Sequence, residues 1–295
     1  MSAGDYPDRL RELIDEYLAG LEFASASGPS PLAEFVEAMR YSLLAGGKRV
    51  RPVLCLASAR AAGAEPESVL PAAAAIELIH TYSLIHDDLP AMDDDEMRRG
   101  RPTSHVKYGE DVAILVGDGL FAEAINLFAG EQEGDPANVN AALRELAGAT
   151  GVEGMVGGQY LDVTAGGELD ADALRELHFR KTGRLIAASV LVPQILAGAP
   201  EAATIPYRQY ADELGVLFQI VDDILDVTGS DAELGKPHGS DERHGKLTYV
   251  SLFGLDQARE LAARSHRQAR DALSGIDGDT GDLEMITDFI HTRQT

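Results

Sequence analysis

Apolar residues recur at helical spacing along almost the whole chain, and this periodicity constrains the fold more than any other feature of the sequence. The apolar residues of the first twenty-odd positions fall on one helical face, and a second stripe follows over 32–43. Alternating strand patterns and Asn-Gly hairpin signals are absent. The pattern predicts an all-α helical bundle, forming a single domain over 1–295. Alanine-rich runs typical of closely packed, buried helices lie at 53–62, 71–86 and 184–198.

The negative charge of the chain argues against some classes of binding partner. It has 295 residues, with 25 lysines and arginines against 49 aspartates and glutamates, a formal net charge of −24. This excess of acid argues against nucleic acid and against anionic membranes, since clusters of Lys and Arg bind both. The acidity fits either a high-salt habitat or an ordinary acidic surface.

The sequence also predicts a cytoplasmic protein without a stable membrane anchor. The longest apolar stretch, 185–199, is shorter than the roughly 20 residues of a membrane helix. The first residues lack the basic start and apolar run of a secretory signal. Cys55 is the single cysteine, which excludes an internal disulfide and fits a reducing compartment.

A first cluster of carboxylates directly follows an apolar helical segment. The sequence His-Asp-Asp-Leu-Pro-Ala-Met-Asp places Asp87 and Asp88 at the end of a predicted helix. This position is unusual, because the helix dipole favours cations at the C-terminal end. In an unbroken helix Asp93 would point about 240° away from Asp87, but Pro90 interrupts the helix. We therefore expect the chain to fold back and bring Asp93 beside Asp87.

A second cluster lies inside an apolar helical segment. Asp222 and Asp223 stand four and three residues before Asp226, so the three share a helix face, with Gln219 one turn earlier. Three like charges on a buried helix are destabilising unless a counter-charge meets them. Two such clusters suggest a hard divalent cation, and Mg²⁺ is typically held by one or two carboxylates, waters and substrate phosphates.

Positive charge gathers at four places, which is informative in so acidic a chain. Lys48 and Arg51 belong to Gly-Gly-Lys-Arg-Val-Arg-Pro, where glycine backbone groups can help to hold a phosphate. Any one place alone fits a surface salt-bridge patch. Together with two carboxylate clusters, they describe a pocket for phosphates bridged by a metal ion. The other three places hold Arg98, Arg99 and Arg101, then Lys181 and Arg184, then Lys236 and Lys246.

The ordered set of motifs resembles the trans-isoprenyl diphosphate synthases, the family of farnesyl and geranylgeranyl diphosphate synthases. The match runs from about Leu32 to about Arg270 and includes Ser-Leu-Ile-His-Asp-Asp-Leu-Pro-Ala-Met-Asp, Gly-Gly-Gln-Tyr-Leu-Asp, Lys-Thr-Gly and Phe-Gln-Ile-Val-Asp-Asp-Ile-Leu-Asp. The resemblance implies a homodimer of helical bundles, each around a deep central cavity. It also implies a prenyltransferase that joins isopentenyl diphosphate to an allylic diphosphate, with about two or three Mg²⁺ per site.

The resemblance assigns roles to the clustered residues. The metal ligands would be Asp87, Asp93 and Asp222, with Asp88 supporting and Asp223 and Asp226 nearby. Isopentenyl diphosphate would contact Lys48, Arg51, His80 and Arg99, although His80 alone also fits a hydrogen-bonded core histidine. The allylic diphosphate would contact Arg98, Lys181, Thr182, Gln219, Lys236 and Lys246.

Product length should depend on the floor of the cavity. Tyr82 and Ser83 stand five and four residues before Asp87, about one turn deeper along the helix. A bulky Tyr82 predicts a fifteen-carbon product, with twenty carbons as the alternative. A class I terpene cyclase is less favoured, because it lacks the Lys48 and Arg51 site. A non-catalytic prenyl synthase subunit usually loses aspartates or arginines that this chain keeps.

Overall fold

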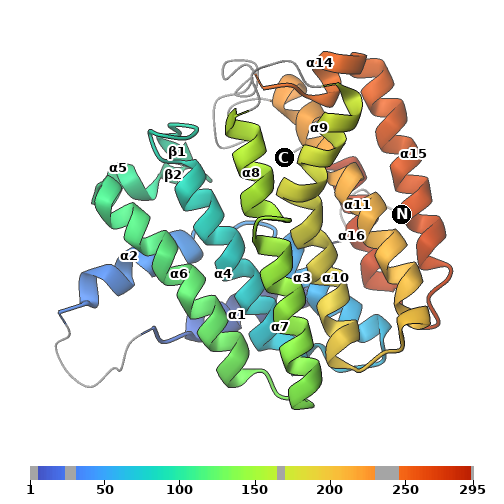
Figure 1. The fold of residues 1–295 in the computed structure, drawn as a ribbon, viewed down its shortest axis with the longest axis horizontal. Helices are drawn as coiled ribbons and strands as arrows, with labels where there is room; N and C mark the ends of the chain where they lie inside the picture. The colour runs from blue at the N-terminus through green and yellow to red at the C-terminus, as the bar shows by residue number, and fades with distance from the viewer. Residues whose placement is uncertain (1–5, 24–30, 165–169, 230–245, 294–295) are drawn as a thin grey trace.

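Regular structure in the computed structural model is almost entirely helical. Among the described residues the exception is an antiparallel pair of two-residue strands, β1 (Met97–Arg98) and β2 (Arg101–Pro102), which the sequence did not predict. The predicted all-α fold is confirmed (Figure 1). Lys236, a predicted diphosphate ligand, lies outside the described residues. These residues are 6–23, 31–164, 170–229 and 246–293.

Long apolar helices form the centre of the bundle (Figure 1). The alanines at 72–75 are fully buried, and their small side chains let α4 approach its neighbours α3 and α6 closely. The next central helix, α10, packs on α3, α7 and α11. The central helices are α3 (Val50–Ala61), α4 (Leu70–Asp87), α6 (Glu110–Glu131), α10 (Arg184–Leu196) and α11 (Glu201–Thr228).

The remaining helices surround this centre and bury one face each. In α15, for example, Ala258, Ala262, Ala269 and Leu273 recur at helical spacing and are buried, and the helix packs along α11. These outer elements are α1 (Asp8–Gly20), α2 (Ala33–Leu43), η1 (Pro66–Val69), α5 (Ser104–Tyr108), α7 (Pro136–Thr150), α8 (Met155–Thr164), α9 (Ala171–His178), α14 (Tyr249–Phe253), α15 (Leu255–Leu273) and α16 (Gly281–Thr292).

One π-helical turn, η2 (Phe179–Gly183), joins α9 to α10 and carries two of the predicted site residues. Such turns often mark functional sites, because the extra residue displaces side chains from the regular helical register. Two glycines let neighbouring helices approach it. A Cβ on Gly158 of α8 would lie 2.2 Å from Lys181 N, and one on Gly215 of α11 would lie 3.1 Å from Gly183 Cα. The position of η2 between these helices is therefore fixed by close backbone packing.

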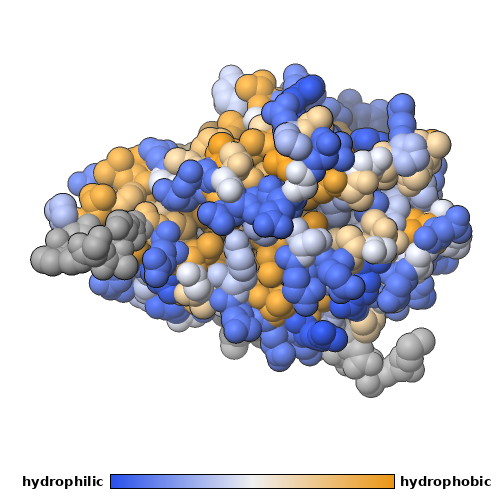
Figure 2. All heavy atoms as spheres, turned by 90° about the horizontal axis from the view of Figure 1, so that it is seen from below, coloured by the Kyte–Doolittle hydropathy of each residue, from blue (hydrophilic) through white to orange (hydrophobic). Residues whose placement is uncertain are grey.

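The expectation that no apolar segment is long enough to cross a membrane needs correction. Two helical segments, 66–87 and 110–131, reach the required length and hydropathy, a test that core helices of soluble proteins also pass. The first is mostly buried in the bundle. The second packs on α4 and leaves Ile114, Leu115 and Phe121 exposed, so α6 has an uncovered apolar face. On the face of the molecule in Figure 2, hydrophilic side chains surround several hydrophobic patches.

Candidate active site

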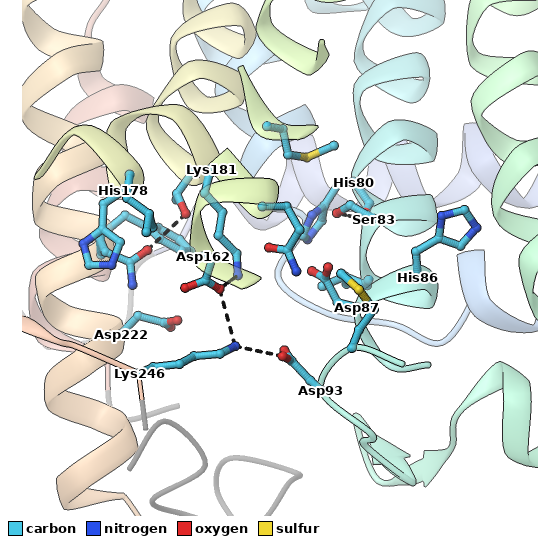
Figure 3. A pocket seen from close by; sticks show the side chains of 18 of the residues that line it. His80, Ser83, His86, Asp87, Asp93, Asp162, His178, Lys181, Asp222 and Lys246 are labelled. Carbon is cyan, nitrogen blue, oxygen red and sulfur yellow. Dashed lines mark hydrogen bonds and ion pairs between the residues drawn. The ribbon is translucent and has the colours of Figure 1, made fainter. Parts of the chain in front are cut away.

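A cavity of about 720 Å³ lies between α4 on one side and α8, η2 and α11 on the other (Figure 3). It gathers side chains that are far apart in the sequence. Lys48 and Asp88 do not line it. The predicted site residues that do are Arg51, His80, Tyr82, Ser83, Asp87, Asp93, Arg98, Arg99, Lys181, Thr182, Gln219, Asp222, Asp223, Asp226 and Lys246.

The end of α4 forms the first acidic wall. The helix stops at Asp87, Pro90 follows in a turn, and Asp93 N donates a hydrogen bond to Asp87 O at 2.9 Å. The chain thus folds back and sets the two side chains at one edge of the cavity, as expected from the break at Pro90. Burial raises the pKa of Asp87 to about 6, and the charge of Asp93 adds to the rise although Lys181 opposes it.

Asp88 has a different environment from its neighbour. Since successive residues of a helix point about 100° apart, it faces away from the cavity when Asp87 faces into it. Its buried carboxylate accepts hydrogen bonds from Arg98 Nε at 2.7 and 3.0 Å. Arg98 in turn lines the cavity. The structure therefore separates Asp88 from the carboxylates that line the cavity and makes it the partner that orients Arg98.

The second acidic wall is α11, and its three aspartates differ in exposure. The side chain of Asp222 is 58% exposed, whereas Asp223 and Asp226 are buried. Asp223 accepts from Gln219 Nε2 at 2.8 Å and from Tyr249 N at 2.7 Å. Gln219 Oε1 accepts from the Thr182 hydroxyl at 3.0 Å. This relay fixes the direction of the Gln219 amide and of Thr182 at the cavity.

Two lysines lie between the acidic walls (Figure 3). Lys181 Nζ donates to Asp162 Oδ2 at 2.6 Å. Lys246 Nζ donates to Asp93 Oδ1 at 2.9 Å and lies 3.6 Å from Asp162 Oδ2. Cations and carboxylates thus alternate across the cavity. This arrangement suits an anion that binds together with a metal ion, because the lysines can bind the anion and the carboxylates can bind the metal.

A second cationic group lies deeper against α3 and α4. Arg51 Nη1 lies 3.3 Å from His80 Nε2, and the Arg51 guanidinium lies 5.6 Å from the Phe218 ring centroid. Burial lowers the pKa of Arg51 to about 10, against the pull of Glu77 and Asp222. Burial and the Arg51 charge lower the pKa of His80 well below its ordinary value, so His80 is a neutral acceptor for Arg51.

The Gly-Gly-Lys-Arg segment that precedes α3 is built to admit another guanidinium. Arg99 donates to Gly46 O, and a Cβ on Gly47 would lie 2.7 Å from Arg99 Cζ. Gly47 has a φ of 117°, which an L side chain rarely adopts. Lys48 is directed elsewhere, with its ammonium 5.2 Å from the Phe289 ring centroid.

A buried ion pair holds the Gly-Gly-Lys-Arg segment in place. Arg49 donates to Glu77 Oε1 at 2.6 Å, to Asp15 Oδ1 at 2.9 Å and to Leu43 O at 2.7 Å. The side chains of Arg49 and Glu77 are each 1% exposed. Arg49 also has a positive φ of 52°, a strained conformation that persists because these contacts hold it.

Aromatic side chains meet at the α4 side of the cavity. The Tyr82 ring lies edge-on to Phe121 of α6 at 5.4 Å and to His86 at 5.7 Å between centroids. Gly117 of α6 makes room for His86, since a Cβ there would lie 2.1 Å from His86 Nε2. Ser83 donates its hydroxyl to His80 O at 2.9 Å. Tyr82 therefore has a defined position, backed by α6.

Some lining residues were not predicted from the sequence, and the polar ones include Asp162, His178 and Arg293. Asp162 ends the Gly-Gly-Gln-Tyr-Leu-Asp motif, which could have singled it out. His178 stacks against Tyr249, and burial lowers its pKa to about 4. Arg293 follows α16 and lies 3.1 Å from Asp222 Oδ1 and 4.4 Å from the Phe218 ring centroid. No motif marks Arg293, because only the packing of α16 on α11 brings the end of the chain to the cavity.

The carboxylates fit a magnesium site. Among the residues that the structure describes, no three metal-ligating side chains converge into a closed cage. Mg²⁺ needs no such cage, since it takes one or two carboxylates and completes its shell with water and substrate phosphate. Burial and, less strongly, the charge of Asp93 raise the pKa of Asp87, and a bound cation would stabilise its charged form. Asp87 and Asp93 on one wall and Asp222 on the other are the residues that would hold the ion.

The family model of polyprenyl synthetases matches residues 33–282 of the chain. The chain belongs to this family. It is a prenyltransferase, and the substrates of its family are isoprenyl diphosphates, bound with Mg²⁺.

The relatives of this chain are named after different products. The chain is 47% identical over 266 residues to the heterodimeric geranylgeranyl pyrophosphate synthase large subunit 1 of Arabidopsis thaliana, covering 88% of this chain and 72% of that protein. It is 42% identical over 296 residues to the farnesyl diphosphate synthase of Escherichia coli, covering 98% and 99%. The geranyltransferase of Helicobacter pylori, solved with magnesium and isoprenyl diphosphate, is similar with a TM-score of 0.83 at 29% identity, over 96% and 94% of the chains.

Proposed function

We propose that the protein condenses isopentenyl diphosphate with dimethylallyl and geranyl diphosphates to make farnesyl diphosphate. The observation that carries this proposal is the arrangement of two acidic walls, Asp87 with Asp93 and Asp222, around Lys181 and Lys246. This arrangement suits a metal-bound diphosphate, and the separate group around Arg51 suits a second diphosphate. A terpene cyclase needs only one diphosphate, so the second group favours condensation.

Each group then has a defined task in the reaction. Mg²⁺ held by Asp87, Asp93 and Asp222 would neutralise the leaving diphosphate as its C–O bond breaks. Lys181, Lys246 and Arg98 bind the same diphosphate, while Thr182 and Gln219 orient it.

The second diphosphate would bind Arg51 and Arg99, with Lys48 reaching it from its position beside Phe289. The isopentenyl double bond, held in register by these cations, attacks the allylic carbon. Substrates that fill the cavity would displace its water, which protects the allylic cation, and the proton lost from the new chain passes to the departing diphosphate.

Tyr82 supports the fifteen-carbon product. Its ring is buried against Phe121 and His86, so a growing chain that reaches it meets a packed aromatic contact. We expect Tyr82→Ala to lengthen the main product by five carbons, because it removes this ring from the floor. The test is product analysis of the purified protein with Mg²⁺ and both five-carbon substrates. Unchanged product length in Tyr82→Ala would refute the floor assignment.

Geranylgeranyl diphosphate is the second candidate product. The Arabidopsis relative at 47% identity is named a geranylgeranyl pyrophosphate synthase. The same product analysis decides between the two. A main product of twenty carbons from the unmodified protein would favour the second candidate, and a product from the allylic substrate alone would indicate cyclisation.

We further infer a homodimeric, single-domain protein of the cytoplasm. One contiguous apolar core runs from Tyr6 to Ile290, which supports a single domain. The exposed Ile114, Leu115 and Phe121 of α6 give a second copy an apolar face to cover. Light scattering of the purified protein tests the dimer: a monomer mass would contradict it.

A further inference from the structure

Asp162 joins the two lysines that the proposed function assigns to the allylic diphosphate. Its Oδ2 atom accepts from Lys181 Nζ at 2.6 Å and lies 3.6 Å from Lys246 Nζ. Lys246 Nζ also donates to Asp93 Oδ1 at 2.9 Å. Two ammonium groups that share one carboxylate oxygen would repel each other without it. Asp162 is therefore the carboxylate that the two lysines share at the cavity, and Asp93 is a second, closer partner of Lys246 (Figure 3).

The fold fixes Asp162 in this place. α8 can bring it to Lys181 only because Gly158 lets the helix approach the backbone of η2. The Asp162 side chain is 13% exposed, so solvent screens its ion pairs weakly. Burial alone would raise the pKa of Asp162, but Lys181 and Lys246 lower it below the ordinary value. Asp162 is thus a charged acceptor at neutral pH.

We propose that Asp162 is a positioning residue that stands in for the allylic diphosphate until the substrate arrives. This inference rests on the proposed function. A carboxylate and a diphosphate both present oxygen acceptors to an ammonium group, which has three donors to share between them. The two ammonium groups therefore already lie close to the place of the diphosphate when the substrate enters, and this limits the reorganisation needed to bind it.

The same exchange affects the first acidic wall. Lys246 Nζ donates to Asp93 Oδ1, and the proposed function assigns the carboxylate of Asp93 to Mg²⁺. When Lys246 Nζ moves to a diphosphate oxygen, the carboxylate of Asp93 becomes available to a metal ion. Binding of the diphosphate and of the metal would thus favour each other through Lys246, while Asp162 keeps the lysine within reach.

Asp162→Asn in the full chain tests the proposal, because it removes the charge and keeps the shape. We expect the Kd for inorganic pyrophosphate with Mg²⁺, measured by calorimetry, to equal or fall below that of the unmodified protein, since the neutral amide competes less well than a carboxylate for the two ammonium groups. We expect kcat for condensation to fall about tenfold, since the lysines are no longer aimed. A Kd weakened by more than about threefold, or a kcat within about threefold of the unmodified protein, would overturn the proposal.

Glu153→Gln is the matched control. Glu153 pairs with Arg180 of the same π-helical turn at 3.2 Å, is 80% exposed and does not line the cavity. The substitution removes the same charge beside η2, and we expect the Kd for pyrophosphate and the kcat for condensation to keep their original values. If the unmodified protein shows no condensation, the proposed function fails, but the pyrophosphate Kd still judges Asp162.

A crystal structure of the unmodified protein with Mg²⁺ and inorganic pyrophosphate keeps the proposal testable should Asp162→Asn not fold. We expect Lys181 and Lys246 to donate to pyrophosphate oxygens, with Lys246 withdrawn from Asp93. If both ammonium groups keep their present carboxylate partners while pyrophosphate is bound, the stand-in role is wrong.

Discussion

The two cationic groups of the cavity differ in what holds them. Lys181 and Lys246 have carboxylate partners, Asp162 and Asp93. In the described part of the chain Arg51 and Arg99 have no carboxylate within ion-pair distance, and their contacts are His80, Gly46 O and the Phe218 ring. A diphosphate that comes with a metal ion can exchange with the carboxylates of the first group. A diphosphate that comes without one needs the bare cations of the second.

The two groups also differ in how their positive charges are balanced. The lysines neutralise their own partners, whereas the arginines repel each other and are partly buried. Glu77, the buried partner of Arg49, lies under the arginine group, and its negative charge favours the charged forms of Arg51 and Arg99. The second group is therefore held by its scaffold, and the first by its own ion pairs.

The largest effect should come from the metal-binding side. We expect Asp87→Asn to lower kcat about a thousandfold, on the order of 4 kcal/mol, because the leaving diphosphate loses its metal ion. Steady-state kinetics with saturating Mg²⁺ and both substrates measures this. The KM for isopentenyl diphosphate should change little, and a large rise in it would break the separation of the two groups.

His178 lines the cavity near Lys181, and it tests how burial on that side affects the stability of the fold. Its pKa is about 4 in the folded protein against 6.5 ordinarily, because burial penalises the charged imidazole. The neutral imidazole therefore contributes fully to the free energy of unfolding above pH 6.5. This contribution is lost as pH falls towards 4, by about 3 kcal/mol at most. We expect His178→Gln to flatten the free energy of unfolding over this interval in urea titrations. Parallel curves for the two proteins would contradict the buried, neutral imidazole.

Arg51→Gln tests the second group directly. We expect the KM for isopentenyl diphosphate to rise about a hundredfold, since a buried charged contact to the diphosphate is lost. The KM for geranyl diphosphate should stay within about threefold of the original value. Arg259→Gln, an exposed arginine of α15, is the control. Equal rises in both KM values would show that the two groups act as one site.

The smallest effect should come from Arg293, which touches both sides of the cavity. It pairs with Asp222 at 3.1 Å and lies over the same Phe218 ring as Arg51. We expect Arg293→Gln to raise the KM for isopentenyl diphosphate about threefold, the size of a partly exposed charged contact. A change confined to the KM for geranyl diphosphate would instead tie Arg293 to the metal-binding side.

The sequence predicts those parts of the site that depend on backbone geometry over a few neighbouring residues. The break at Pro90 predicts that Asp93 returns to Asp87, and helical spacing predicts that Gln219 meets Asp223. Both follow from backbone geometry within a few residues. The helical fold is predicted for the same reason, because its signal is periodic along the chain.

Long-range packing decides what the sequence does not predict. Asp88 is adjacent to Asp87 in the motif, yet its carboxylate binds Arg98 on the other side of the helix. Lys48 shares a motif with Arg51 but lies beside Phe289, which belongs to the last helix. Arg293 carries no motif at all. In each case the deciding partner comes from a different part of the chain, which spacing in the sequence does not encode.

The π-helical turn η2 makes the enzyme sensitive to chain length at one place. Its wide turn holds one residue more than an α-helical turn, and Lys181 and Thr182 lie inside it. Deleting a single residue there would rotate the preceding helix by about 100° relative to α10. Engineered variants of this protein should therefore tolerate substitutions around 179–183 far better than insertions or deletions.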